Sequence, residues 1–392
     1  MEEAKNRNLI FISLSQFGMA SSVNFITVML PFYVLKISPY SPQETLIWIG
    51  WIMGASGIVI IFASNFWGML TSRFSPKLLY MRGLLANLVL FFLMGFTSDL
   101  RVLLVLRILQ GVFGGISTVG LLIISASSSQ EKISSDIGFF QTFQTMGFLV
   151  GPPMGAFAAS VFGYRGAFVS ASVILFIVLV FCYFYVREVP LQQEKESFFG
   201  RSNINRQTVM GWLLSFMVMV QLMFLPSILP NVLERFGLGK SVALKWAGVV
   251  IMFYTATATF STYFWPKLSR RVGIKKMILF IVLLGSVFQA LLSFSRGPID
   301  FIIIRMIQTG LVAGAIPLVI SIFAVRQKGN VIGFLNSGRF AGTALGPIMA
   351  TSVLAVSNLP SLYLLITGLT LLALLAFNLS LKGAGQEVIS SG

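Results

Sequence analysis

Long apolar stretches dominate this sequence and recur along its whole length. Each holds about 20 residues or more, which is the length that a helix needs to cross the hydrocarbon core of a bilayer. Short segments rich in Gly, Pro and charged residues separate them, as expected for turns. The pattern predicts an all-α membrane protein with twelve membrane-spanning helices, at residues 9–35, 46–71, 78–98, 102–127, 137–160, 167–186, 207–232, 242–266, 277–295, 301–325, 331–356 and 361–381.

Composition excludes the soluble classes that a basic chain otherwise suggests. The chain is 56% hydrophobic and 10% charged, against roughly 25% charged residues in soluble domains. Its formal net charge is +16, but the basic residues lie in short loops between apolar stretches, so no nucleic-acid partner is expected. With no histidine and a single cysteine, Cys182, we expect no cofactor, no metal site and no internal disulfide.

Two unrelated motifs occur twice at nearly the same separation. The first pair is 198 residues apart and the second pair 195, which is close to half of the 392 residues. In order, the motifs are Arg107-x-x-Gln110-Gly111, Arg305-x-x-Gln308-x-Gly310, Gly147-x3-Gly151-Pro152 and Gly342-x3-Gly346-Pro347. A shared long period indicates a doubled unit. We therefore expect two six-helix bundles related by a pseudo-two-fold axis, as in secondary transporters, with bundles at 1–187 and 207–392 joined by a linker at 188–206.

The distribution of Lys and Arg predicts the orientation in the membrane. With the N-terminus inside, about 18 basic residues fall in cytoplasmic segments and 7 in outer loops or adjoining span ends. Cytoplasmic loops carry the excess of positive charge in membrane proteins. We therefore expect a multi-pass protein of the plasma (inner) membrane, with both termini and the 188–206 linker in the cytoplasm.

The loop after the second expected span carries a basic motif, which holds Gly68, Leu70, Arg73 and Lys77. Two interpretations are open. The charges follow from topology alone, or they form a gating clasp with acids or helix C-termini across the bundle. The loop resembles the signature of the major facilitator superfamily, Gly-x-Leu-Ala-Asp-Arg-x-Gly-Arg-Lys, at these four positions.

The fourth and tenth expected spans each carry Arg-x-x-Gln near their start. Arg107, Gln110 and Gly111 are similar to the superfamily's arginine-glutamine-glycine signature, and Arg305 with Gln308 repeats it. An arginine four or five residues inside a span can extend its side chain back to the interface. Its presence in both halves indicates instead a shared structural or ion-handling role, and both interpretations stay open.

Glycines at every fourth position mark the fifth and eleventh expected spans. They are Gly147, Gly151 and Gly155 with Pro152, then Gly338, Gly342 and Gly346 with Pro347. Such a stripe is either a static packing seam or a smooth face along which a neighbouring helix slides. It resembles the glycine-proline signature of the drug:H+ antiporter branch of the superfamily. We expect it to face the other bundle.

Arg339 lies well inside the eleventh expected span. A guanidinium at that depth costs roughly 2.5 kcal/mol or more unless it meets water or a partner. It either lines a central cavity or is buried against backbone carbonyls. We expect the cavity, lined further by the polar residues Asn24, Gln141, Gln144, Gln221, Tyr254 and Asn336.

The acidic residues all lie in loops or at span ends, so no carboxylate is central in any span. A membrane-embedded enzyme is not expected, since the chain has no histidine cluster, P-loop or Gly-x-Ser-x-Gly motif. The resemblance implies a monomeric transporter that exports small hydrophobic or amphipathic molecules by alternating access, with membrane lipid around it and protons as the coupling ion. The alternative is a facilitator or carrier of an anionic molecule.

Overall fold

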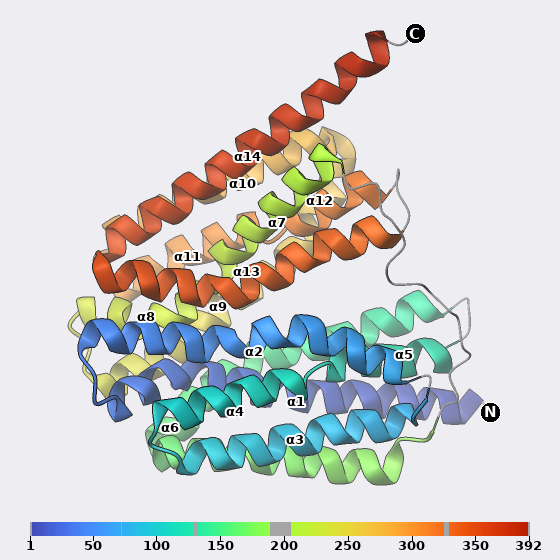
Figure 1. Cartoon of the computed structure of the whole chain (residues 1–392), viewed down its shortest axis with the longest axis vertical. Helices are drawn as coiled ribbons and strands as arrows, with labels where there is room; N and C mark the ends of the chain where they lie inside the picture. The colour runs from blue at the N-terminus through green and yellow to red at the C-terminus, as the bar shows by residue number, and fades with distance from the viewer. Residues whose placement is uncertain (1, 72, 129–131, 189–204, 325–328, 391–392) are drawn as a thin grey trace. The chain divides into compact units, whose positions relative to one another are not determined.

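The computed structural model describes residues 2–71, 73–128, 132–188, 205–324 and 329–390, which are almost entirely helical and contain no β-strand (Figure 1). The elements of the first half are α1 (Glu2–Ile37), α2 (Pro42–Leu70), α3 (Pro76–Phe96), α4 (Leu100–Val112), α5 (Ile116–Ser127) and α6 (Ile133–Tyr185). Those of the second half are α7 (Arg206–Met223), α8 (Leu225–Arg235), α9 (Lys240–Val272), α10 (Ile274–Leu291), η1 (Leu292–Phe294), α11 (Pro298–Val312), α12 (Ala315–Ala324), α13 (Gly329–Val356) and α14 (Leu359–Ser390).

The prediction of an all-α membrane protein is confirmed. Ten helical stretches in the described ranges are long and apolar enough to cross a membrane, and the bent pair α7 and α8 makes an eleventh. One of the ten, Ser135–Tyr185, has 51 residues, roughly 75 Å at 1.5 Å per residue and far more than one bilayer. Its two arms count as two spans, which brings the total to the expected twelve.

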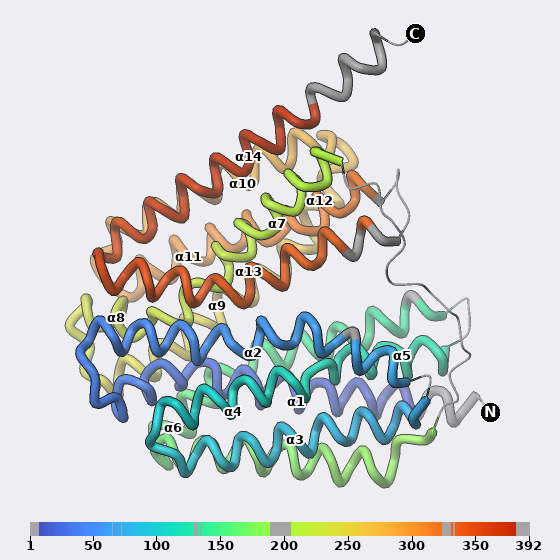
Figure 2. The backbone as a smooth tube through the Cα atoms, in the orientation of Figure 1, coloured from blue at the N-terminus to red at the C-terminus, as the bar shows by residue number. Residues whose placement is uncertain are grey.

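A single glycine divides α6 into these two arms. Gly163 has φ 70° and ψ 176° inside an otherwise helical run, a backbone conformation that is accessible to glycine at little cost. The chain reverses direction there, so the second arm runs opposite to the first (Figure 2). This position lies between the expected spans 137–160 and 167–186.

Three of the expected spans are themselves interrupted, a feature that the apolar pattern did not reveal. The fourth is split into α4 and α5 by Gly115, whose φ is 85°. The seventh bends by 41° between α7 and α8, next to Pro226, and the tenth is split into α11 and α12 beside Gly314. Glycine and proline are the usual causes of such breaks.

The helices form two compact units. The first unit contains residues 1–40, 51–195 and 238–252, and the second contains 41–50, 196–237 and 253–392. Most of the expected linker, 189–204, lies outside the described residues. Aliphatic side chains with interspersed aromatic rings fill the core of both units, yet among the described residues the largest fully buried side chain is an arginine, Arg305.

Candidate functional site

In the first unit, Arg107 of α4 is held in a buried network that links three helices. Its side chain is 6% exposed. Its Nε donates to the carbonyl of Ile52 at 2.8 Å and its Nη2 to that of Met53 at 3.2 Å, both in α2. Nη1 donates to Oε1 of Gln110, whose Nε2 donates to Oδ1 of Asn87 in α3 at 3.2 Å. The Arg-x-x-Gln spacing therefore presents both side chains on one face of α4.

A close approach between α4 and α2 brings Arg107 to these carbonyls. A β-carbon at Gly111 would lie 2.7 Å from the Ser56 carbonyl oxygen, so only glycine fits there. Gly111 therefore allows the short separation between α4 and α2, and this separation places Arg107 within hydrogen-bonding distance of the α2 carbonyls.

In the second unit, Arg305 of α11 is 0% exposed. Its Nη1 and Nη2 donate to the carbonyls of Gln221 and Leu222 in α7, at 2.9 and 2.8 Å. Nη1 also donates to Oε1 of Gln308 at 2.7 Å, and Gln308 Nε2 donates to Oε1 of Gln221 at 3.0 Å. Gln221 Nε2 in turn donates to the Ser286 hydroxyl at 3.2 Å. The network therefore joins α7, α10 and α11.

The break between α7 and α8 explains why Arg305 binds there. Proline has no N–H, so Pro226 cannot donate to the carbonyl of Leu222 four residues earlier. The guanidinium supplies the missing donor. The rings of Phe224 and Tyr254 each lie 4.9 Å from its Cζ, a cation–π geometry.

These contacts decide between the two interpretations of the Arg-x-x-Gln pairs. Neither arginine extends to an interface, and both instead bind carbonyls of a neighbouring helix, so the shared structural role holds. Neither forms an ion pair within the described residues. Gln221 and Tyr254, which we expected in the cavity, are 0% and 6% exposed. Both residues contact Arg305: the Gln221 carbonyl accepts a hydrogen bond from its guanidinium, and the Tyr254 ring packs on it.

The first glycine stripe is a packing seam inside the first unit. β-Carbons at Gly147 and Gly151 would each lie 2.6 Å from a carbonyl oxygen of α1, those of Phe17 and Ser21. One at Gly155 would lie 2.7 Å from the carbonyl carbon of Phe25. Backbone therefore meets backbone along two full turns of helix.

The second stripe repeats this seam between α13 and α7. β-Carbons at Gly338 and Gly342 would lie 2.8 and 2.6 Å from the carbonyl oxygens of Trp212 and Phe216. The expectation that the stripes face the other bundle is wrong. Each stripe packs on the first helix of its own half, α1 or α7. The missing β-carbons allow the backbone of that helix to approach closely. Pro152 and Pro347 beside the seams are buried.

Polar side chains of the first unit meet at Ser117 of α5. Gln144 Nε2 of α6 and Gln16 Nε2 of α1 both donate to its hydroxyl, at 3.1 and 2.6 Å. Gln141 is exposed, and Asn24 donates to the Ala20 carbonyl of its own helix. Sequence reasoning missed Gln16 and Ser117, although their polar character inside apolar spans was a signal.

Arg339 differs from the two buried arginines. It is exposed, and its Cζ lies 5.6 Å from the Phe340 ring. In the described part of the chain its guanidinium has no hydrogen bond or ion pair, so the alternative of burial against carbonyls does not apply. Asn336, one turn earlier on α13, is half-buried. Arg339 and Asn336 are thus two polar side chains of α13 that keep some exposure to solvent.

The basic loop closes onto its own unit. Lys77 Nζ donates to the Tyr183 carbonyl at 2.8 Å, in the last turn of α6. Gly68 faces Thr118 of α5, with Cγ2 3.7 Å from a β-carbon position, and Arg73 is exposed. Lys77 therefore supports a helix C-terminus, within the unit rather than across to the other bundle.

Sequence reasoning also missed a third repeated pair. Trp67 Nε1 donates to the Val112 carbonyl and Trp265 Nε1 to the Gly310 carbonyl, both at 2.6 Å. Donors and acceptors are each 198 residues apart. Arg107 and Arg305 are separated by the same 198 residues, so a search for other residues repeated at this offset would have found the two tryptophans.

The chain matches known transporters over nearly its whole length. The profile of the Major Facilitator Superfamily matches residues 12–308. Multidrug resistance protein MdtG of Klebsiella pneumoniae (strain 342) is 24% identical over 392 residues, which cover 97% of this chain and 95% of that protein. A staphyloferrin B transporter of Staphylococcus aureus (strain NCTC 8325 / PS 47) is 34% identical over 175 residues, 44% of this chain and 42% of that protein.

A solved structure has the same fold. The nucleoside transporter NupG superposes with a TM-score of 0.77 at 14% identity, over 97% of this chain and 99% of that chain. The likeness concerns the arrangement of the helices and carries no information on substrate.

Proposed function

The chain belongs to the major facilitator superfamily, and from that premise we propose that it exports small hydrophobic or amphipathic molecules by proton-coupled alternating access. The observation that carries the proposal is the similarity to a multidrug resistance protein over 97% of the chain. The glycine-proline segment of α6, with its resemblance to the drug:H+ antiporter branch, supports the same branch of the superfamily.

In this proposal residues 1–187 and 207–392 are the moving bundles and 188–206 is their cytoplasmic linker. Their substrate cavity is lined by Arg339 and Asn336 from the second half and by Asn24, Gln141 and Gln144 from the first. Gln221 and Tyr254 are left out of this lining because both side chains are buried: Gln221 is hydrogen-bonded to Gln308 and Ser286, and the Tyr254 ring packs on the Arg305 guanidinium.

A second candidate is a carrier of anionic molecules, and Arg339 favours it. This exposed guanidinium has no acidic partner among the described residues, and no span carries a central carboxylate. A cation of this kind in a low-dielectric cavity attracts anions and repels cations. The two candidates share the cavity and differ in the charge of the cargo and in coupling.

Proteoliposome transport separates them. Labelled cationic, neutral and anionic amphiphiles are offered with and without an imposed pH gradient. Export by proton antiport requires that a cationic or neutral substrate accumulates against its gradient only while the pH gradient lasts, and that a protonophore abolishes the accumulation. Flux of an anion that ignores the pH gradient would replace the first candidate by the second.

Arg339 variants test the cavity itself. We expect Arg339→Ala to lose roughly tenfold or more of the flux per folded molecule and Arg339→Lys to keep part of it, since lysine retains charge but not the planar fork. Thermal stability should change little, because within the described residues the guanidinium has no hydrogen bond or ion pair to lose and only a contact with the exposed Phe340 ring. Arg296→Ala, at an exposed loop arginine, is the matched control. Normal flux in Arg339→Ala would remove Arg339 from the cavity.

A further inference from the structure

Two adjoining hollows open at the end of the first unit where α1 ends and the arms of α6 meet. One is an apolar groove of about 390 Å³ and the other a pocket of about 370 Å³ with basic side chains. Phe162 lines both. The transport proposal uses neither of them.

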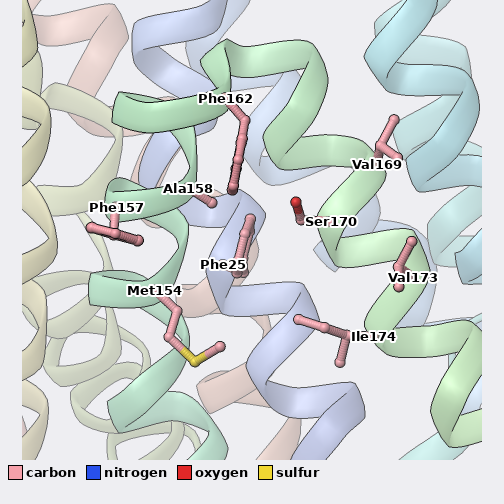
Figure 3. Close-up of a pocket in the computed structure, with 9 residues that line it drawn as sticks. All are labelled: Phe25, Met154, Phe157, Ala158, Phe162, Val169, Ser170, Val173 and Ile174. Carbon is pink, nitrogen blue, oxygen red and sulfur yellow. The ribbon is translucent and has the colours of Figure 1, made fainter.

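The groove is a furrow between the two arms of α6 with α1 at its floor. Figure 3 shows Met154, Phe157 and Ala158 on one arm, Val169, Ser170, Val173 and Ile174 on the other, and Phe25 of α1 behind them. Phe157 and Phe162 are each 64% exposed. Ser170 is the only polar side chain in this lining, and its hydroxyl donates to the Gly166 carbonyl of its own helix. The furrow therefore offers apolar surface and no free polar partner.

The adjoining pocket is cationic. Lys36 and Arg165 line it together with Tyr33, Tyr164 and Ser98, and both basic side chains are exposed. Lys36 Nζ lies 5.4 Å from the centre of the Tyr164 ring. No acidic side chain lines the pocket in the described residues, and the carboxylate of Asp99 nearby caps α4 by accepting from the Arg101 N–H at 2.7 Å. Within the described residues neither basic side chain forms an ion pair, so the lining itself carries two positive charges and no negative one.

The order of the hollows follows the layers of a bilayer. Lys36 lies in the last turn of α1 and Arg165 two residues past the Gly163 break, so the cations lie at the ends of their spans, at headgroup level. From Phe162 back to Met154 and from Arg165 on to Ile174, the arms carry the groove roughly 12–14 Å toward the membrane centre, at 1.5 Å per residue. A charged end at the interface joined to an apolar furrow in the hydrocarbon layer matches the shape of a phospholipid.

We propose that this end of the first unit is a binding site for one anionic phospholipid, with its phosphate between Lys36 and Arg165 and one acyl chain in the groove between the arms of α6. Basic residues near a membrane surface attract anionic headgroups. The exposed rings of Phe157 and Phe162 would pack on the acyl chain. The site does not depend on the direction of transport or on its coupling, so it is tested by binding alone.

The experiment uses the purified full chain in phosphatidylcholine nanodiscs. Phosphatidylglycerol is titrated in, and bound lipid is counted by native mass spectrometry after release. We expect one retained phosphatidylglycerol. The double variant Lys36→Gln, Arg165→Gln should bind it roughly tenfold or more weakly, from about 1 kcal/mol per basic residue. Ser170→Phe, which fills the groove and leaves both cations in place, should also weaken it.

Controls separate this site from general surface charge and from a free-anion pocket. Arg101→Gln removes an exposed basic residue of the same unit that lines neither hollow, and it should bind as the wild type does. Unchanged retention in the double variant would overturn the proposal. The proposal would also be overturned if soluble glycerol phosphate protected the protein against melting as well as phosphatidylglycerol does, and if Ser170→Phe left that protection unchanged. The acyl groove would then play no part in binding. The single variants Lys36→Gln and Arg165→Gln are measured as well. A melting temperature in phosphatidylcholine equal to that of the wild type excludes misfolding as the cause of weaker binding.

Discussion

The two arginine networks carry the same donors and bind different helices. Arg107 donates to α2, whereas Arg305 donates to α7. One repeat length of 198 residues takes Ser56 of α2 to Tyr254 of α9. The backbone of Ser56 lies against Gly111 of α4, whereas the ring of Tyr254 lies over the Arg305 guanidinium. Because the bulky Tyr254 occupies the position equivalent to Ser56, Arg305 binds carbonyls of α7 and not of α9.

Proline decides where that second arginine goes. Pro226 lies beside the break between α7 and α8 and leaves the Leu222 carbonyl without a helical donor, whereas Pro31 lies within the continuous α1. The polar partner moves with it, from Asn87 of α3 in the first unit to Gln221 of α7 in the second. Duplication thus preserved the donors, and the acceptors followed the local backbone.

The largest expected effect tests this difference directly. Arg305→Ala leaves the Leu222 carbonyl buried without a donor and removes the cation between two rings, so we expect a loss of roughly 3 kcal/mol in the free energy of unfolding. Arg107→Ala should lose less, about 1–2 kcal/mol, because its acceptors lie in an unbroken helix. Reversible unfolding in mixed micelles measures both. Equal losses would show that the break at Pro226 is irrelevant.

The glycine seams give an intermediate effect. The first seam is tight at its third glycine, Gly155, whereas a β-carbon at Gly346 would meet its nearest atom only at 3.5 Å, where α7 is about to end. We expect Gly155→Ala to cost about 1–3 kcal/mol and Gly346→Ala to stay within about 0.5 kcal/mol. Melting temperatures in detergent compare the pair. A larger loss at Gly346 would contradict the packing described for α7 and α13.

The tryptophans should give the smallest effect, and an equal one in both halves. Trp67→Phe and Trp265→Phe each keep an aromatic ring and remove one hydrogen bond to a carbonyl, worth about 1 kcal/mol. Trp67 also supports Arg82, whose Cζ lies 3.2 Å from its ring centre, and phenylalanine preserves that contact in part. Unfolding of the two variants, side by side with the wild type, is the measurement. A loss confined to one half would end the parallel.

Apolar length and internal repetition were enough to predict the helices, because a membrane span must satisfy its backbone internally and an apolar stretch of about 20 residues has no other solution there. The same pattern could not show the breaks at Gly115 and Phe224, since a short interruption leaves the mean apolarity unchanged. It also placed Gln221 and Tyr254 in a cavity, because polarity in a span indicates a partner without saying which.

The sequence by itself determined the fold class, the repeat and the identity of the charged donors. Only the tertiary structure decided which carbonyls Arg107 and Arg305 bind, which helix each glycine stripe faces, and that Arg339 alone of these three arginines stays exposed. The physical reason is that a donor and its position along a helix are local properties of the chain. Its acceptor lies on another helix, and close packing between helices selects it.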